Sequence, residues 1–60
     1  MIYDNVKALC EERGLSISAV EKQAGLGNGT IRGWNESSPT VDNLQSVAKV
    51  LDVEINELLK

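Results

Sequence analysis

A chain of 60 residues has room for one domain, residues 1–60, and for only a small hydrophobic core. Its 42% of hydrophobic residues indicates a folded protein, and one cysteine without any histidine excludes an internal disulfide, a zinc cluster and a Cys–His nucleophile. The net charge of −3 weighs against a generic nucleic-acid-binding protein, because basic side chains provide most non-specific affinity for phosphates.

The first predicted helix begins near the N-terminus and ends at a glycine. Four apolar residues recur at helical spacing and share one face: Ile2, Val6, Leu9 and Cys10. Gly14 follows at the place where a glycine in a left-handed conformation ends a helix. We therefore interpret Cys10 as a small buried residue of the core and not as a reactive thiol.

The second predicted helix is short and leads closely into a third. Ser16 is its N-cap candidate, its apolar residues are Ile17, Val20 and Ala24, and Gly25 ends it. Two short helices joined by so few residues must cross at a steep angle, as in a helix-turn-helix. Such a link needs a positive φ, which glycine adopts without strain, although Gly25 is also compatible with an ordinary helix end.

The third predicted helix starts after Gly27, and it is the candidate functional segment. Ile31 and Trp34 lie three residues apart on its buried face. Its outward residues are small or polar and include no acid: Asn28, Gly29, Thr30, Arg32 and Gly33. An exposed arginine is more often solvated than bound to a ligand, so only the joint spacing of these residues points to a binding surface.

The rest of the chain predicts two further helices after a loop at residues 35–39, where Pro39 excludes a continuous helix. Thr40 caps a fourth helix, whose apolar stripe is Val41, Leu44, Val47, Ala48 and Leu51. Asp52 caps a short fifth helix that carries Ile55, Leu58 and Leu59. Since no segment alternates at period two, we expect an all-α fold of five short helices.

The apolar residues at the C-terminus allow two interpretations. Leu58 and Leu59 close the core against the first helix, or they form an apolar patch with Val53 and Ile55. Such a patch would pair with a second copy of the chain about a two-fold axis. Both interpretations are open from the sequence.

Charge is distributed unevenly, and its distribution locates the expected contact with DNA. Residues 1–13 carry −1, residues 36–60 carry −3, and residues 14–35 carry +1, from Lys22 and Arg32 against Glu21. We expect any DNA contact in this weakly basic middle third. No apolar run approaches the ~20 residues of a membrane span, and no signal segment follows Met1, so we expect a soluble cytoplasmic protein.

Nearly the whole chain resembles the phage repressor and Cro-like (XRE-type) helix-turn-helix family. The matching stretches are VKALCEERGLS at 6–16, GLGNGTIRGW at 25–34, PTVDNL at 39–44 and VAKVLDVEINELL at 47–59. Their order, spacing and apolar register agree with the family without a gap. The resemblance implies a lambda-repressor-like DNA-binding domain, with the helix-turn-helix formed by helices 2 and 3, that binds double-stranded DNA operators as a homodimer and regulates transcription.

The resemblance also implies a set of base-reading positions, which are Asn28, Gly29, Thr30, Arg32 and Gly33. Ile17 stands where the family commonly has a phosphate-contacting glutamine, and Gly27 where it often has a capping serine. Because Gly29 and Gly33 have no side chains, direct readout rests mainly on Asn28 and Arg32, which suit adenine and guanine in the major groove. The glycines let the backbone approach DNA closely, and free N–H groups at the start of helix three can bind a phosphate.

Glu21 is the most unusual departure, because the family favours a small residue at this position. Its carboxylate either accepts hydrogen bonds from the N–H groups of residues 27–29, or pairs with Arg32, or is simply solvated. The expected phosphate contacts are hydroxyls, amides and one cation: Ser16, Ser18, Lys22, Asn35, Ser37, Ser38 and Thr40. So few charges predict a shallow salt dependence and weak monomer binding, which a dimer on two half-sites would overcome.

The function expected from these observations is sequence-specific regulation of transcription, most simply repression of a mobile element's own promoter. The alternative is a protein-binding adaptor or antitoxin-like module on the same fold, which the low basic charge favours. We do not expect an enzyme, because the sequence offers no paired carboxylates in a plausible cleft, no histidine and no phosphate-binding loop. We likewise expect no cofactor, metal, membrane or small-molecule substrate.

Overall fold

The computed structural model describes residues 1–60 and contains four α-helices, one short 3₁₀ helix and no strand. The elements are α1 (Ile2–Glu12), α2 (Ile17–Gln23), η1 (Arg32–Asn35), α3 (Val41–Leu51) and α4 (Ile55–Leu59). The predicted all-α fold is therefore confirmed. None of the helices combines the length and the apolarity that crossing a membrane requires.

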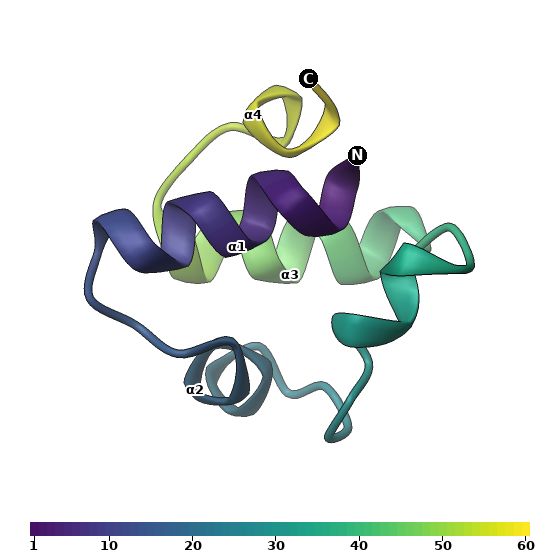
Figure 1. Ribbon diagram of the computed structural model, residues 1–60, viewed down its shortest axis with the longest axis horizontal. Coiled ribbons are helices and arrows are strands. Elements are labelled where there is room, and N and C mark those ends of the chain that lie inside the picture. The colour runs from purple at the N-terminus through teal and green to yellow at the C-terminus, as the bar shows by residue number, and fades with distance from the viewer.

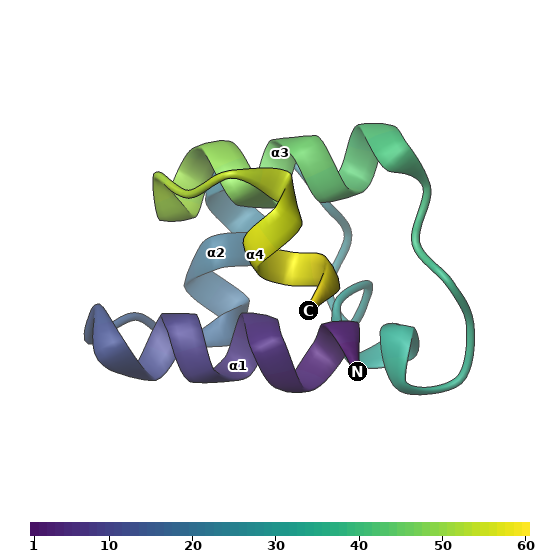
Figure 2. The same cartoon turned by 90° about the horizontal axis from the view of Figure 1, so that it is seen from above.

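The helices form a small box around one core. Figures 1 and 2 show α1 and α3 running in the same direction along two sides, with α2 crossing below them and α4 above them in Figure 1. The buried apolar residues come from every element or its border: Val6, Cys10, Val20, Ile31, Trp34, Leu44, Val47, Ala48, Leu51 and Leu58. The apolar stripes predicted for the first, second and fourth helices therefore face the core, with one exception. Val41 is 63% exposed at the start of α3, so its predicted place in the stripe is wrong.

The predicted N-caps of α2 and α3 are confirmed. The Ser16 hydroxyl accepts a hydrogen bond from the Ala19 N–H (3.1 Å), and Thr40 accepts one from the Asn43 N–H (3.2 Å). Each bond satisfies an N–H that has no partner within its helix, which stabilises a helix by about 1 kcal/mol.

Helix α2 ends in a turn that reverses the chain toward the functional segment. The Leu26 N–H donates to the Glu21 carbonyl (2.8 Å) across Gly25, whose φ is +74°. This is the helix-ending motif in which a left-handed residue lets the next N–H reach back across the last turn. The positive φ predicted at Gly25 is confirmed.

Two predicted helix boundaries are wrong. The third helix is not an α-helix: residues 28–31 form turns, and only Arg32–Asn35 are helical, as 3₁₀. Glycine-rich segments resist the α-helix because glycine there costs about 1 kcal/mol relative to alanine, and Gly29 has a φ of +86°. Asp52 does not cap the last helix but ends α3 in a left-handed conformation (φ +57°), and Glu54 precedes α4 without a side-chain cap.

The packing of α4 decides between the two interpretations of the C-terminal leucines, core residues or an interface patch. Leu58 is fully buried, whereas Leu59 is 52% exposed. The Asn5 side-chain amide donates to the carbonyls of Leu58 (3.0 Å) and Lys60 (2.8 Å), which joins the two termini seen side by side in Figures 1 and 2. Leu58 therefore belongs to the core and not to an interface patch.

Cys10 is also a core residue. Its side chain is buried on α1, and burial raises the pKa of the thiol despite the opposing effect of Arg13. A thiol with a raised pKa stays neutral and unreactive near neutral pH. The interpretation of Cys10 as a small apolar core residue is confirmed.

Gly25→Ala should lower the free energy of unfolding by about 1–2 kcal/mol, because a β-carbon is strained at positive φ. Gly33→Ala is the control: Gly33 has an ordinary φ, and an added β-carbon there meets no atom within 4 Å. Its effect on stability should be neutral or slightly favourable, by up to about 1 kcal/mol. Chemical denaturation followed by circular dichroism measures both, and equal losses would mean that the φ of Gly25 is not the cause.

Candidate functional site

The segment after the turn at Gly25 is anchored by two buried side chains. Ile31 is fully buried and Trp34 is 6% exposed, as their predicted place on the inner face requires. Backbone hydrogen bonds run from the Thr30 N–H to the Gly27 carbonyl (3.2 Å) and from the Gly33 N–H to the Gly29 carbonyl (3.0 Å). These contacts fix a compact, irregular helical segment whose other side faces outward.

The residues predicted to read bases lie on this outer side. Asn28, Gly29 and Arg32 are exposed, and Thr30 and Gly33 are half-buried. The side chains of Asn28 and Arg32 make no hydrogen bond or ion pair within the chain. Both are therefore free to bind an external partner.

Glu21 connects α2 to this segment. Its side chain is only 4% exposed, and its carboxylate accepts hydrogen bonds from two backbone N–H groups. Oε1 accepts from Gly29 (3.2 Å) and Oε2 accepts from Ile31 (2.8 Å). The hypothesis that Glu21 binds free N–H groups near the start of the segment is confirmed at Gly29, whereas the alternative pairing with Arg32 does not form.

The bond to Ile31 was not predicted. The sequence predicts an α-helix whose free N–H groups are those of residues 27–29, and in such a helix the Ile31 N–H would bond to a backbone carbonyl. The chain instead turns at Gly29, which brings the Ile31 N–H toward α2. The available signal was the density of glycine in residues 25–33, which makes a regular α-helix there unfavourable.

The N–H groups expected to bind a phosphate are only partly available. Those of Gly29 and Ile31 are used by Glu21, and that of Thr30 by a carbonyl. The N–H groups of Gly27 and Asn28 donate to no acceptor within the chain. Of the N–H groups of residues 27–31, only these two are therefore available to a phosphate.

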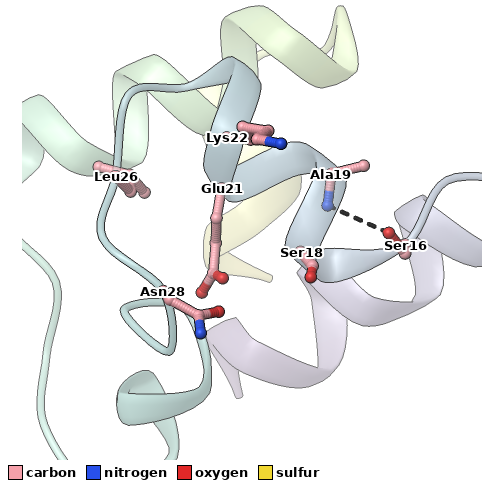
Figure 3. Close-up of a pocket in the computed structure, with 7 residues that line it drawn as sticks. All are labelled: Ser16, Ser18, Ala19, Glu21, Lys22, Leu26 and Asn28. Carbon is pink, nitrogen blue, oxygen red and sulfur yellow. Dashed lines mark hydrogen bonds between the residues drawn. The ribbon is translucent and has the colours of Figure 1, made fainter.

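A hollow of about 590 Å³ lies between α2 and the segment. Figure 3 shows Glu21 extending from α2 toward the turn that carries Asn28, with Ser16 and Ser18 at the start of the helix. The residues that line it are Ser16, Ser18, Ala19, Glu21, Lys22, Leu26 and Asn28. The structure thus brings together three of the predicted phosphate contacts and one predicted base reader.

The other predicted phosphate contacts do not line this hollow. Asn35 is exposed at the end of η1, and Ser37, Ser38 and Thr40 are exposed in the loop between η1 and α3. The Ser37 hydroxyl donates to the Gly33 carbonyl (3.3 Å), so its proton is already used. Thr40 uses its oxygen as a helix cap but keeps its hydroxyl proton free to donate.

Ile17 occupies the position where a phosphate-contacting glutamine is common, and it has a structural role instead. It is half-buried and packs against the core, so it adds apolar contact at the first position of α2. The only cation of the hollow is Lys22, which is exposed and makes no ion pair. The surface around Asn28 is therefore polar but weakly charged.

Comparison with known families gives one match. Residues 6–58 fit the family model described as helix-turn-helix, which covers most of the chain. No curated protein matches the chain. The matched range begins within α1 and ends within α4, so it includes both helices that flank the turn and every residue of the candidate site.

Proposed function

Because the chain belongs to the phage repressor and Cro-like (XRE-type) helix-turn-helix family of DNA-binding regulators, we propose that it is a sequence-specific repressor of phage or mobile-element type. In this proposal, residues 28–33 lie in the major groove of an operator. The observation that carries it is the pair of exposed side chains of Asn28 and Arg32, which have no partner within the chain.

Asn28 and Arg32 have the chemistry for direct readout. An asparagine side chain binds adenine and an arginine binds guanine through paired hydrogen bonds, each worth about 1–3 kcal/mol of discrimination. Gly29 and Gly33 add no side chain between these readers, so the backbone can approach the bases. The half-buried Thr30 contributes its hydroxyl or methyl group at the edge of the contact.

Phosphate contacts would come from both sides of the reading segment. Ser16, Ser18 and Lys22 lie at the hollow. On the other side, Asn35 ends η1, and Ser38 and Thr40 lie in the loop beyond it. Ser37 contributes only if its hydrogen bond to Gly33 opens. With one cation at the hollow, binding should depend only weakly on salt.

Arg32→Ala should lower affinity for the preferred DNA by about 1–3 kcal/mol and relax the preference at one base pair. Lys22→Ala should instead weaken binding similarly on all sequences, because a lysine at a phosphate carries no sequence information. Gel-shift titrations of both variants on a preferred and a scrambled duplex make this comparison. Equal, sequence-independent losses would assign Arg32 to a phosphate.

Selection of bound duplexes from a random pool tests the proposal as a whole. The expected result is enrichment of one half-site motif, and the motif should contain positions that depend on Asn28 and Arg32. No enrichment, even at low salt, would contradict sequence-specific binding. That result would favour the alternative of a protein-binding adaptor or antitoxin-like module, for which eight exposed or half-exposed acids offer a surface.

A further inference from the structure

Glu21 is the one charged side chain that the fold buries. A buried carboxylate is unfavourable unless its oxygens are hydrogen-bonded, and here each oxygen accepts from a backbone N–H. Bonds to a charged acceptor are stronger than bonds between neutral groups. These two bonds therefore join the middle of α2 firmly to the segment beyond the turn.

The segment that Glu21 holds has few bonds of its own. Between Gly27 and Ile31 the chain forms turns, and the only backbone hydrogen bond within this stretch joins Thr30 to Gly27. The side chain of Ile31 is fully buried, and leaving its N–H without an acceptor would be costly. Glu21 thus supplies acceptors that a regular α-helix would supply from its own carbonyls.

The two held amides adjoin the two proposed readers. Asn28 immediately precedes Gly29, and Arg32 immediately follows Ile31. We propose that Glu21 is a positioning residue: it fixes the backbone at residues 29 and 31 and so sets the directions in which Asn28 and Arg32 point, without contacting DNA itself. This inference rests on the proposed function, and it assigns part of the sequence selectivity to a residue of α2.

A carboxylate beside a DNA-binding surface also has an opposite effect, because it repels phosphates. Glu21→Gln separates the two effects. Glutamine keeps the size but removes the charge, and it places an amide N–H₂ against one of the backbone N–H donors. Loss of positioning lowers affinity for the preferred duplex alone, whereas loss of repulsion raises affinity for every duplex.

The experiment compares the wild type with Glu21→Gln on a duplex that the wild type selects from a random pool and on a scrambled duplex. The ratio of the affinity for the selected duplex to the affinity for the scrambled duplex should fall about tenfold or more in Glu21→Gln. Glu36→Gln is the charge control, because Glu36 is exposed next to η1 and its side chain accepts no backbone bond. The affinity ratio of Glu36→Gln should stay within about twofold of that of the wild type, because this exposed residue lies away from the bases.

Two further measurements guard against a trivial loss of folding. Val47→Ala removes core volume on α3, outside residues 27–33, and destabilises the fold while leaving Glu21 and its two backbone partners in place, so at a temperature where it is folded its affinity ratio should equal that of the wild type. Amide hydrogen exchange should become faster at Gly29 and Ile31 in Glu21→Gln, with the helices α1 and α3 still protected.

The outcomes are distinct. A selective wild type with an equally selective Glu21→Gln overturns this inference and leaves the proposed function standing. An equal rise in the affinity of Glu21→Gln for both duplexes also overturns it, since Glu21 would then act only by repulsion. A wild type that selects no duplex overturns the proposed function itself and this inference with it.

Discussion

Leu58→Ala should lower the free energy of unfolding by about 2–5 kcal/mol, because it leaves a cavity where a fully buried leucine joins α4 to the core. A domain of this size has little stability in reserve, since its core is small. The variant should therefore be largely unfolded near 37 °C. Chemical denaturation followed by the fluorescence of Trp34, which is buried in the same core, measures the loss.

Leu59→Ala is the matched control, because it makes the same chemical change one residue later on a side chain that is 52% exposed. Its effect on stability should be within about 0.5 kcal/mol, as for other surface substitutions. Similar losses in the two variants would mean that α4 does not dock on the core as described. The same pair also bears on self-association, because, of these two leucines, only Leu59 is exposed for contact with a second copy.

The sequence predicts the long helices well, because their apolar residues follow one period over several turns. In α3, Leu44, Val47 and Leu51 are buried at the predicted spacing, and the Thr40 cap marks the start. In α1, Val6 and Cys10 are likewise buried at the predicted spacing. Burial follows the local pattern at these positions. It does not at Val41, which the same pattern places in the stripe but which is 63% exposed at the start of α3.

The segment that carries the function is predicted less well, for a physical reason. Ile31 and Trp34 are correctly placed inside, since three-residue spacing puts both on one side in an α-helix or a 3₁₀ helix. The helix type is wrong because glycines remove the local preference that would have favoured an α-helix. The observed conformation is held by hydrogen bonds to Glu21, ten residues before Ile31, and the spacing of apolar residues cannot predict such a contact.

Asp52, at the end of α3, is a second residue whose conformation the sequence pattern does not predict. An aspartate shortly before a segment with apolar residues at helical spacing is typical of an N-cap, and the sequence alone favours that interpretation. The structure instead uses Asp52 in a left-handed conformation to end α3, and the Val53 N–H reaches back to the Ala48 carbonyl (3.0 Å). Aspartate tolerates this conformation better than most side chains, so one residue suits either helix end.

The largest functional effect should come from joining two half-sites. If the protein binds as a homodimer, a duplex with two half-sites should bind about 10²–10⁴ times more tightly than a duplex with one, because the second contact becomes intramolecular. The backbone measures 25 × 24 × 17 Å, so two copies fit side by side on one face of DNA when the half-sites are one helical turn, about 34 Å, apart. Gel-shift titrations with duplexes built from the selected half-site measure the ratio.

Spacing variants show whether geometry produces this gain. Adding about 5 base pairs between the half-sites turns the second one to the opposite face of the duplex, and adding about 10 restores the face but not the distance. A fixed dimer should lose most of the gain in both variants, whereas two independent monomers should bind all the two-site duplexes equally. Because the hollow beside Asn28 has only Lys22 as a cation, a single domain has little electrostatic affinity to add. Equal binding to one-site and two-site duplexes would therefore contradict binding as a dimer. In that case the contacts of Asn28, Arg32 and the backbone around them would have to provide all the affinity of a single domain.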